Sequence, residues 1–157
     1  MKKILAVLSV LILVTLACSL QPVGTPATPV VGTVEEIFVL TSIGRAYNGA
    51  TTPTTFITTR SWQVTEIKTY HWNEGNGTTP GTISLLAADG TSYGPWQASG
   101  LPGSGDVSNA YWVVKPNITI PAGTYSIIDS DPATWAQNSE TGEAGMAWVS
   151  GVPQDNP

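Results

Sequence analysis

Residues 81–97 read GTISLLAADGTSYGPWQ, and the pair Asp89-Gly90 divides this stretch into two short β-prone runs. Asp-Gly between two such runs favours the backbone angles of a tight turn, so we predict an antiparallel β-hairpin here. Comparable short runs recur on both sides, separated by Gly, Pro and Asn. We therefore predict eight or nine strands in an all-β, two-sheet antiparallel β-sandwich, with a jelly roll as the more specific form.

Three runs outside this hairpin carry further detail. Residues 36–43 are apolar in both alternating phases, which predicts a strand buried on both faces. In residues 61–72 the apolar phase changes between Val64 and Ile67, which predicts a β-bulge or a strand that crosses between sheets. A last strand is expected from about Gly145 to Ser150.

The N-terminus has the features of an export signal. Two lysines precede the apolar residues 4–17, a run shorter than the roughly 20 residues that a membrane-spanning helix needs. It ends in VTLAC at 14–18, which resembles the lipobox of bacterial lipoproteins. The resemblance implies that Cys18 becomes the lipidated first residue of the mature protein, with a diacylglyceryl group and an N-acyl chain such as palmitate. Cys18 is the only cysteine, so an intramolecular disulfide is not expected.

These features predict a division of the chain into four parts. We expect a signal helix at 1–17, the lipidated cysteine with a disordered Pro-rich tether at 18–34, the β-sandwich at 35–151 and a tail at 152–157. Without its leader the chain has four basic and eleven acidic side chains, a net charge of −7. Such a surface disfavours nucleic acid, so the expected membrane attachment depends on the lipid, at the cell membrane or the outer membrane.

Several short motifs accompany the expected strands: YHWN at 70–73, PGTI at 80–83, YGPW at 93–96, PAGTY at 121–125 and DSDP at 129–132. Together with Trp135 they form a series that resembles a little-characterised domain of secreted bacterial proteins, over roughly residues 36–151. This resemblance implies an exported β domain of the cell envelope and assigns no activity.

Six tryptophans suggest both a core and a binding surface. Three fall within strand patterns, which favours core packing: Trp62, Trp112 and Trp148. Three lie at strand ends or in loops: Trp72, Trp96 and Trp135. Exposed rings at such positions can stack on the apolar faces of sugars, so these three are the candidate ligand-binding residues. The alternative is that they cover the ends of the core, with their N–H groups bonded to loop carbonyls.

Five oxygen-bearing side chains gather near the last loop: Asp129, Asp131, Asn138, Glu140 and Glu143. Hard oxygen ligands in a loop suit Ca²⁺, which makes these residues a candidate calcium site, whereas turns and helix caps use the same residue types. The only histidine, His71, is expected to be structural, because zinc sites need several His or Cys ligands. We predict no catalytic residue, with a glycoside hydrolase that uses paired carboxylates as the enzymatic alternative.

The sequence thus predicts a lipid-anchored, extracytoplasmic binding module, for carbohydrate through exposed aromatic rings. The alternative is a structural or protein-interaction domain of the cell envelope without a small ligand. The oligomeric state stays open.

Overall fold

A computed structural model describes residues 32–154 of the chain. The expected signal peptide, Cys18, most of the tether and residues 155–157 lie outside the described residues. In the described part, ten strands and three short 3₁₀ helices follow one another in this order: β1 (Glu35–Leu40), β2 (Thr54–Thr58), β3 (Ser61–Tyr70), η1 (Asn73–Gly75), β4 (Thr82–Ala87), β5 (Ser92–Gln97), β6 (Ser99–Leu101), η2 (Ser104–Asp106), β7 (Tyr111–Val114), β8 (Ile118–Ile120), β9 (Gly123–Asp129), η3 (Ser139–Thr141) and β10 (Ala147–Gln154). No helix within residues 32–154 has the length and apolar character to cross a membrane.

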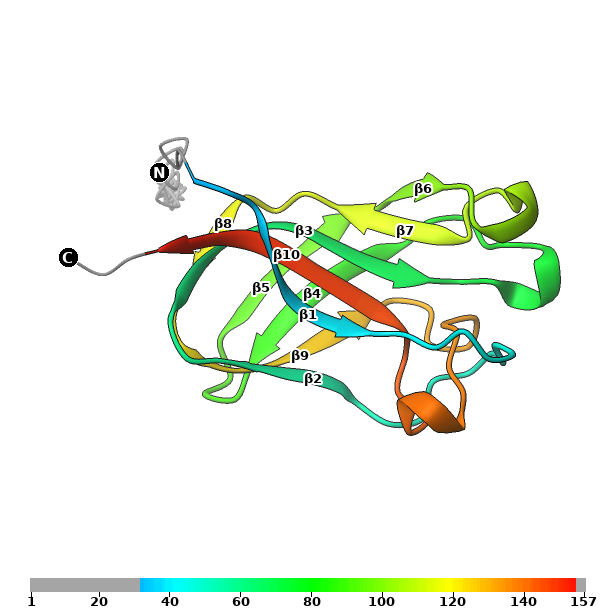
Figure 1. Cartoon of the computed structure of the whole chain (residues 1–157), viewed down its shortest axis with the longest axis horizontal. Helices are drawn as coiled ribbons and strands as arrows, with labels where there is room; N and C mark the ends of the chain where they lie inside the picture. Colours follow the sequence, from blue (N-terminus) through cyan, green and yellow to red (C-terminus); the bar gives the residue numbers. More distant parts are fainter. Residues whose placement is uncertain (1–31, 155–157) are drawn as a thin grey trace, which may run out of the picture.

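The strands form two antiparallel sheets that pack face to face (Figure 1). One sheet has six strands in the order β1-β10-β3-β7-β6, and β8 pairs with the first part of β3. The other has four strands in the order β2-β9-β4-β5. The predicted class is therefore confirmed: the described chain is an all-β, two-sheet β-sandwich.

The topology also matches the jelly roll, the more specific form of sandwich that the sequence predicts. Without the three-residue strands β6 and β8, eight strands remain, and they pair as β1·β10, β2·β9, β3·β7 and β4·β5. These pairs nest around the β4–β5 hairpin, which is the hairpin predicted at Asp89-Gly90. Such nested pairing is that of one long hairpin wound into two sheets, the arrangement of a jelly roll.

The phase change in β3 is a β-bulge. Glu66 pairs with Ser150 of β10 but Val64 pairs with Gly151, so Thr65 has no partner in the ladder. Because the extra residue restores the inward orientation of the apolar side chains, Val64 and Ile67 are both fully buried. The strand stays in one sheet throughout.

The two outer ends of the described chain differ from the prediction. β1 ends at Leu40, and it is a half-buried edge strand because β10 is its only partner. Ile43, expected inside the strand, lies in the loop that follows and is fully exposed. β10 runs to Gln154, three residues beyond the expected end of the domain, because Val152 is buried and residues 152–154 pair with the start of β3.

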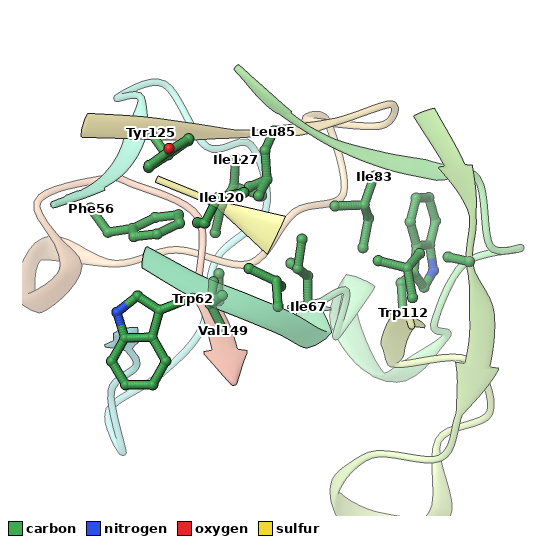
Figure 2. Close-up of a cluster of buried hydrophobic side chains, with 14 of the residues drawn as sticks. Phe56, Trp62, Ile67, Ile83, Leu85, Trp112, Ile120, Tyr125, Ile127 and Val149 are labelled. Atoms are coloured by element: carbon green, nitrogen blue, oxygen red, sulfur yellow. The ribbon is translucent and has the colours of Figure 1, made fainter. Parts of the chain in front are cut away.

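The core lies between the two sheets (Figure 2). Alternation places every second side chain inward, as in β2, where Thr54, Phe56 and Thr58 are buried and Thr55 and Ile57 are exposed. Strands of both sheets contribute large apolar side chains to one cluster, including Phe56, Trp62, Ile67, Ile83, Leu85, Trp112, Ile120, Tyr125, Ile127 and Val149.

Candidate functional site

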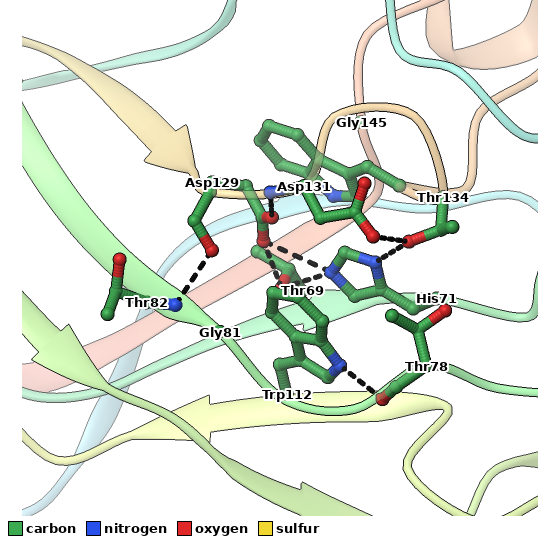
Figure 3. A network of polar contacts seen from close by, with 12 residues as sticks. Thr69, His71, Thr78, Gly81, Thr82, Trp112, Asp129, Asp131, Thr134 and Gly145 are labelled. Atoms are coloured by element: carbon green, nitrogen blue, oxygen red, sulfur yellow. Dashed lines mark hydrogen bonds and ion pairs between the residues drawn. The ribbon is translucent and has the colours of Figure 1, made fainter.

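His71 follows β3 directly and is completely buried. Its ring stacks on Trp112, with the centroids 3.8 Å apart and the planes inclined by 18°. Nδ1 lies 2.9 Å from Thr134 Oγ1, and Nε2 lies 3.1 Å from Asp129 Oδ2 (Figure 3). This pair joins the end of β3 to the end of β9, and so connects the two sheets at one end of the sandwich.

The threonine hydroxyl groups around His71 determine which atoms donate and which accept in part of its hydrogen-bond network. Thr134 Oγ1 donates to Asp131 Oδ2 at 2.7 Å, so it can only accept a hydrogen from His71 Nδ1. Thr69 Oγ1 donates to Asp129 Oδ2 at 2.9 Å. The polar atoms of this network therefore satisfy one another, as expected for a structural histidine.

The buried His71 also positions the two aromatic residues on either side of it. Its backbone N–H donates to Ala110 O, and Tyr70 O accepts from the N–H of Ala136. Tyr70 is the last residue of β3 and Trp72 precedes η1, and their rings stack outside the core with centroids 6.5 Å apart. The loop after Trp72 is held by Asn73, whose side-chain amide donates to Gly77 O and Thr78 Oγ1.

Tyr70 and Trp72 line a groove of about 810 Å³ at the end of the six-stranded sheet where β1 and β3 finish. The lining residues come from four regions: the loop after β1 (Thr41, Ser42, Ile43, Gly44, Arg45, Ala46), the end of β3 and η1 (Tyr70, Trp72, Glu74), η2 with the start of β7 (Ser104, Tyr111), and the approach to β10 (Met146, Trp148). We call this surface the aromatic groove.

Four half-buried rings form a continuous row in the aromatic groove: Trp72, Tyr70, Tyr111 and Trp148. Tyr70 on β3 is paired with Tyr111 on β7, and their ring centroids are 4.8 Å apart. Tyr111 meets Trp148 edge to face at 5.7 Å. Because β10, β3 and β7 are neighbours in the sheet, the row crosses three adjacent strands on their outer face.

Lys68 lies beside this row on the same face of β3 as Tyr70. Its Nζ is 4.7 Å from the centroid of the Trp148 ring and 5.1 Å from that of Tyr111. Both distances fall within the range of cation–π interactions. The half-buried ammonium is thus held against two rings of the groove.

The rim of the groove carries charged and polar groups on loops. Arg45 and Glu74 are both exposed lining residues, and the Arg45 guanidinium lies 5.2 Å from the ring centroid of Tyr47. The loop that carries Arg45 is fixed by Asn138, whose side-chain amide donates to Ser42 Oγ at 2.7 Å and to Arg45 O at 3.3 Å.

The environment of Tyr70 keeps its hydroxyl neutral over a wide pH range. Burial raises the pKa of Tyr70 above its ordinary value, the Ser104 side chain opposes this as a hydrogen-bond partner, and the nearby Tyr111 raises it further. The neutral hydroxyl can both donate and accept a hydrogen bond at the edge of the groove.

The three candidate tryptophans have three different environments. Trp72 lies in the aromatic groove. Trp96 is half-buried on β5 of the other sheet, where it packs against the core. Trp135 is only 5% exposed, and its Nε1 donates to Met146 O, so the prediction of an exposed stacking ring is wrong for Trp135 and the core-covering alternative describes it.

For Trp148 the prediction was wrong in the opposite direction, because a ring expected in the core lies outside it. Its position in a strand predicted core packing, which the structure confirms for Trp62 and Trp112 but not for Trp148. On β10 the inward residues are Ala147 and Val149, so Trp148 faces outward into the groove.

The five candidate calcium ligands have separate roles. Asp129 and Asp131 belong to the His71 network, and Asn138 caps η3 by accepting from Thr141 N. Glu140 accepts a hydrogen bond from Ser42 Oγ, and Glu143 accepts one from Thr51 Oγ1. Residues 32–154 contain no group of three or more His, Cys, Asp or Glu side chains placed to hold a metal ion, and calcium binding stays a prediction without a defined site.

Sequence reasoning missed the groove residues Arg45, Tyr70, Tyr111 and Trp148, and Lys68 beside them. One signal was available: Lys68, Tyr70 and Trp72 follow the period of two that places side chains on one face of a strand. The partners from β7 and β10 depend on strand register between distant segments.

Glu74 is the only carboxylate among the residues that line the groove. Glycoside hydrolysis through an acid pair needs two carboxyl groups across the scissile bond, so the groove offers one half of such a pair. The lining presents aromatic faces, hydroxyl groups and charged side chains.

No protein-family model, curated protein or solved structure matches this chain.

Proposed function

We propose that this protein is an exported, lipid-anchored module that binds carbohydrate in the aromatic groove. The observation that carries the proposal is the row of four half-buried rings across β7, β3 and β10. The axial C–H groups of a pyranose form an apolar face that stacks on an aromatic ring, while its hydroxyls need donors and acceptors at the edge. Tyr70, Ser104, Arg45 and Glu74 supply such groups next to the rings.

The dimensions of the groove suit a small oligosaccharide. Its volume of about 810 Å³ lies in the range of about 300–1,000 Å³ that small-molecule sites occupy. The rings belong to strands of a well-packed sheet and are supported from below by the His71 network, so little conformational freedom is lost when a ligand binds.

The position of the groove agrees with attachment through the N-terminus. β1 starts at Glu35, and the loop after its last residue, Leu40, lines the groove. A six-residue strand spans about 20 Å, so the groove lies at the end of the sandwich opposite to the one where the chain enters β1 (Figure 1). A lipid on Cys18 would therefore leave the groove facing away from the membrane.

Ring removal tests the proposal. The expected mature polypeptide without its cysteine, residues 19–157, contains both sheets and the whole core cluster and is applied to a glycan array. We expect binding of at least one saccharide, and we expect Trp72→Ala and Trp148→Ala each to weaken it roughly tenfold, or by about 1.4 kcal/mol. Titration of the hit by calorimetry measures the change.

Trp96→Ala is the matched control, because it makes the same change at a half-buried tryptophan of the other sheet. It is expected to lower stability without changing the affinity. Binding that survives both groove substitutions would place the ligand elsewhere. Failure to bind any saccharide would favour the alternative of a structural or protein-interaction domain.

A further inference from the structure

We infer that the aromatic groove takes an acidic saccharide, whose carboxylates are bound by Lys68 and Arg45. The inference rests on the proposed function and narrows its substrate class from saccharides in general to uronate-containing ones. It is carried by the distribution of positive charge over the protein.

Basic side chains are scarce in this chain and concentrated at the groove. Residues 19–157 hold four of them: Arg45, Arg60, Lys68 and Lys115. Arg45 lines the groove, and Lys68 touches two of its four rings. Only one acidic residue, Glu74, lines the groove, whereas the same stretch of chain contains eleven. The lining thus holds one cation and one carboxylate, with Lys68 beside it and Glu140 hydrogen-bonded to the lining residue Ser42, so the groove is less acidic than the rest of the protein.

Neither Arg45 in the groove nor Lys68 beside it forms an ion pair with a carboxylate of the described chain. The only ion pair within residues 32–154 joins His71 and Asp129 on the buried side of the sheet. Lys68 instead lies against the faces of Trp148 and Tyr111, and Arg45 against that of Tyr47. A half-buried ammonium that interacts only with rings can still form a charge-assisted hydrogen bond with an incoming carboxylate.

The arrangement matches the shape of a uronate residue. A uronic acid has an apolar pyranose face and a carboxylate at the edge of the ring. Lys68 Nζ lies over the rings of Trp148 and Tyr111, and the ring of Tyr70 lies next to that of Tyr111, so that one sugar can stack on Tyr70 while its carboxylate meets Lys68 Nζ.

Matched acidic and neutral probes test this inference. Residues 19–157 are titrated by calorimetry with oligosaccharides that contain galacturonate, glucuronate, mannuronate or guluronate, each beside its carboxyl-reduced counterpart. We expect at least one acidic form to bind at least tenfold more tightly than its reduced counterpart, and added salt to reduce this difference.

Charge removal at the groove is the second arm. Lys68→Met keeps much of the aliphatic stem, and we expect it to weaken binding of the acidic probe roughly tenfold and to leave the reduced probe unaffected. Lys68→Arg keeps the charge and is expected to retain binding, which separates loss of charge from any loss of folding. Arg45→Gln is expected to act in the same direction as Lys68→Met.

Lys115→Met and Arg60→Gln are the controls, because they remove the same unit charge outside the groove. Equal losses in the controls would show attraction by overall charge and overturn the inference. Equal binding of acidic and reduced probes would overturn it as well but leave the proposed function standing. If neither these probes nor any saccharide on the array binds, the inference and the proposed function both fail.

Discussion

At the scale of the residue, His71 shows how one buried side chain can organise an exposed surface. It is stacked on Trp112 and hydrogen-bonded to Asp129 at the end of β9 and to Thr134 after it, while Tyr70 and Trp72 on either side of it line the groove. The position of the two rings therefore depends on a polar network whose members His71 and Asp129 are buried. Such buried networks are stable only when every member is satisfied, and this one is.

His71→Ala tests this role. The change removes the stacking on Trp112 and takes one hydrogen-bond partner from each of Asp129 and Thr134, which keep their bonds to Thr69 and Asp131. We expect the free energy of unfolding in urea to fall by about 3 kcal/mol, because a cavity is created and the buried Asp129 loses a hydrogen bond. Thr119→Ala, on the exposed side of β8, is expected to change it by less than about 0.5 kcal/mol. A loss below about 1 kcal/mol for His71→Ala would show that the network contributes little.

At the scale of the element, β10 holds β1 in the six-stranded sheet, because it lies between β1 and β3. It pairs with β1 on one side and along the length of β3 on the other, and it brings Trp148 next to Lys68. In its last part, Val152 pairs with Gln63, Pro153 with Trp62 and Gln154 with Ser61, at the start of β3. The buried Val152 ties this part of the strand to the core.

Truncation measures the contribution of this last part. A chain that ends at Gly151 loses three ladder pairs and the burial of Val152 relative to a chain that ends at Gln154. We expect it to be less stable by about 2 kcal/mol or more in thermal unfolding monitored by circular dichroism. Val152→Ala in the chain ending at Gln154 separates the side chain from the backbone pairing. Equal melting temperatures for the two chain lengths would contradict a structural role for residues 152–154.

At the scale of the whole molecule, the sandwich separates the point where the chain enters β1 from the aromatic groove. The chain enters β1 at one end, and the loops after β1 and β3 form the groove at the other (Figure 1). The lipobox-like segment at 14–18 predicts attachment through the N-terminus, which would leave this end of the sandwich facing away from the membrane.

The anchor can be tested directly in a bacterial host. We expect Cys18→Ala to abolish incorporation of labelled palmitate and to leave a precursor that the lipoprotein signal peptidase does not cleave, because the thiol is the acyl acceptor. Ser19→Ala, at the neighbouring position, is expected to remain labelled. Recovery of the unaltered protein without any acyl label would contradict the predicted anchor.

Much of the fold could be predicted from local signals. The hairpin at Asp89-Gly90, the bulge in β3 and the all-β class follow from turn residues and apolar alternation, which act over a few neighbouring residues. The end of β10 could not, because Gly151-Val152-Pro153 resembles a terminal turn until β3 supplies its partners. The same limit applies to Trp148 and Trp135, whose exposure depends on the sheet face and on the loop that covers them.

The sequence by itself therefore determined the strands, their turns, the acidic character of the domain and the expectation of an N-terminal anchor, because each is a property of composition or short-range pattern. The tertiary structure alone decided the aromatic groove. Its rings come from residues 70, 72, 111 and 148, and only the register of β3 with β7 and β10 places them in one row beside Lys68. Strand register is a long-range property, set by which faces of the sheets must be buried together.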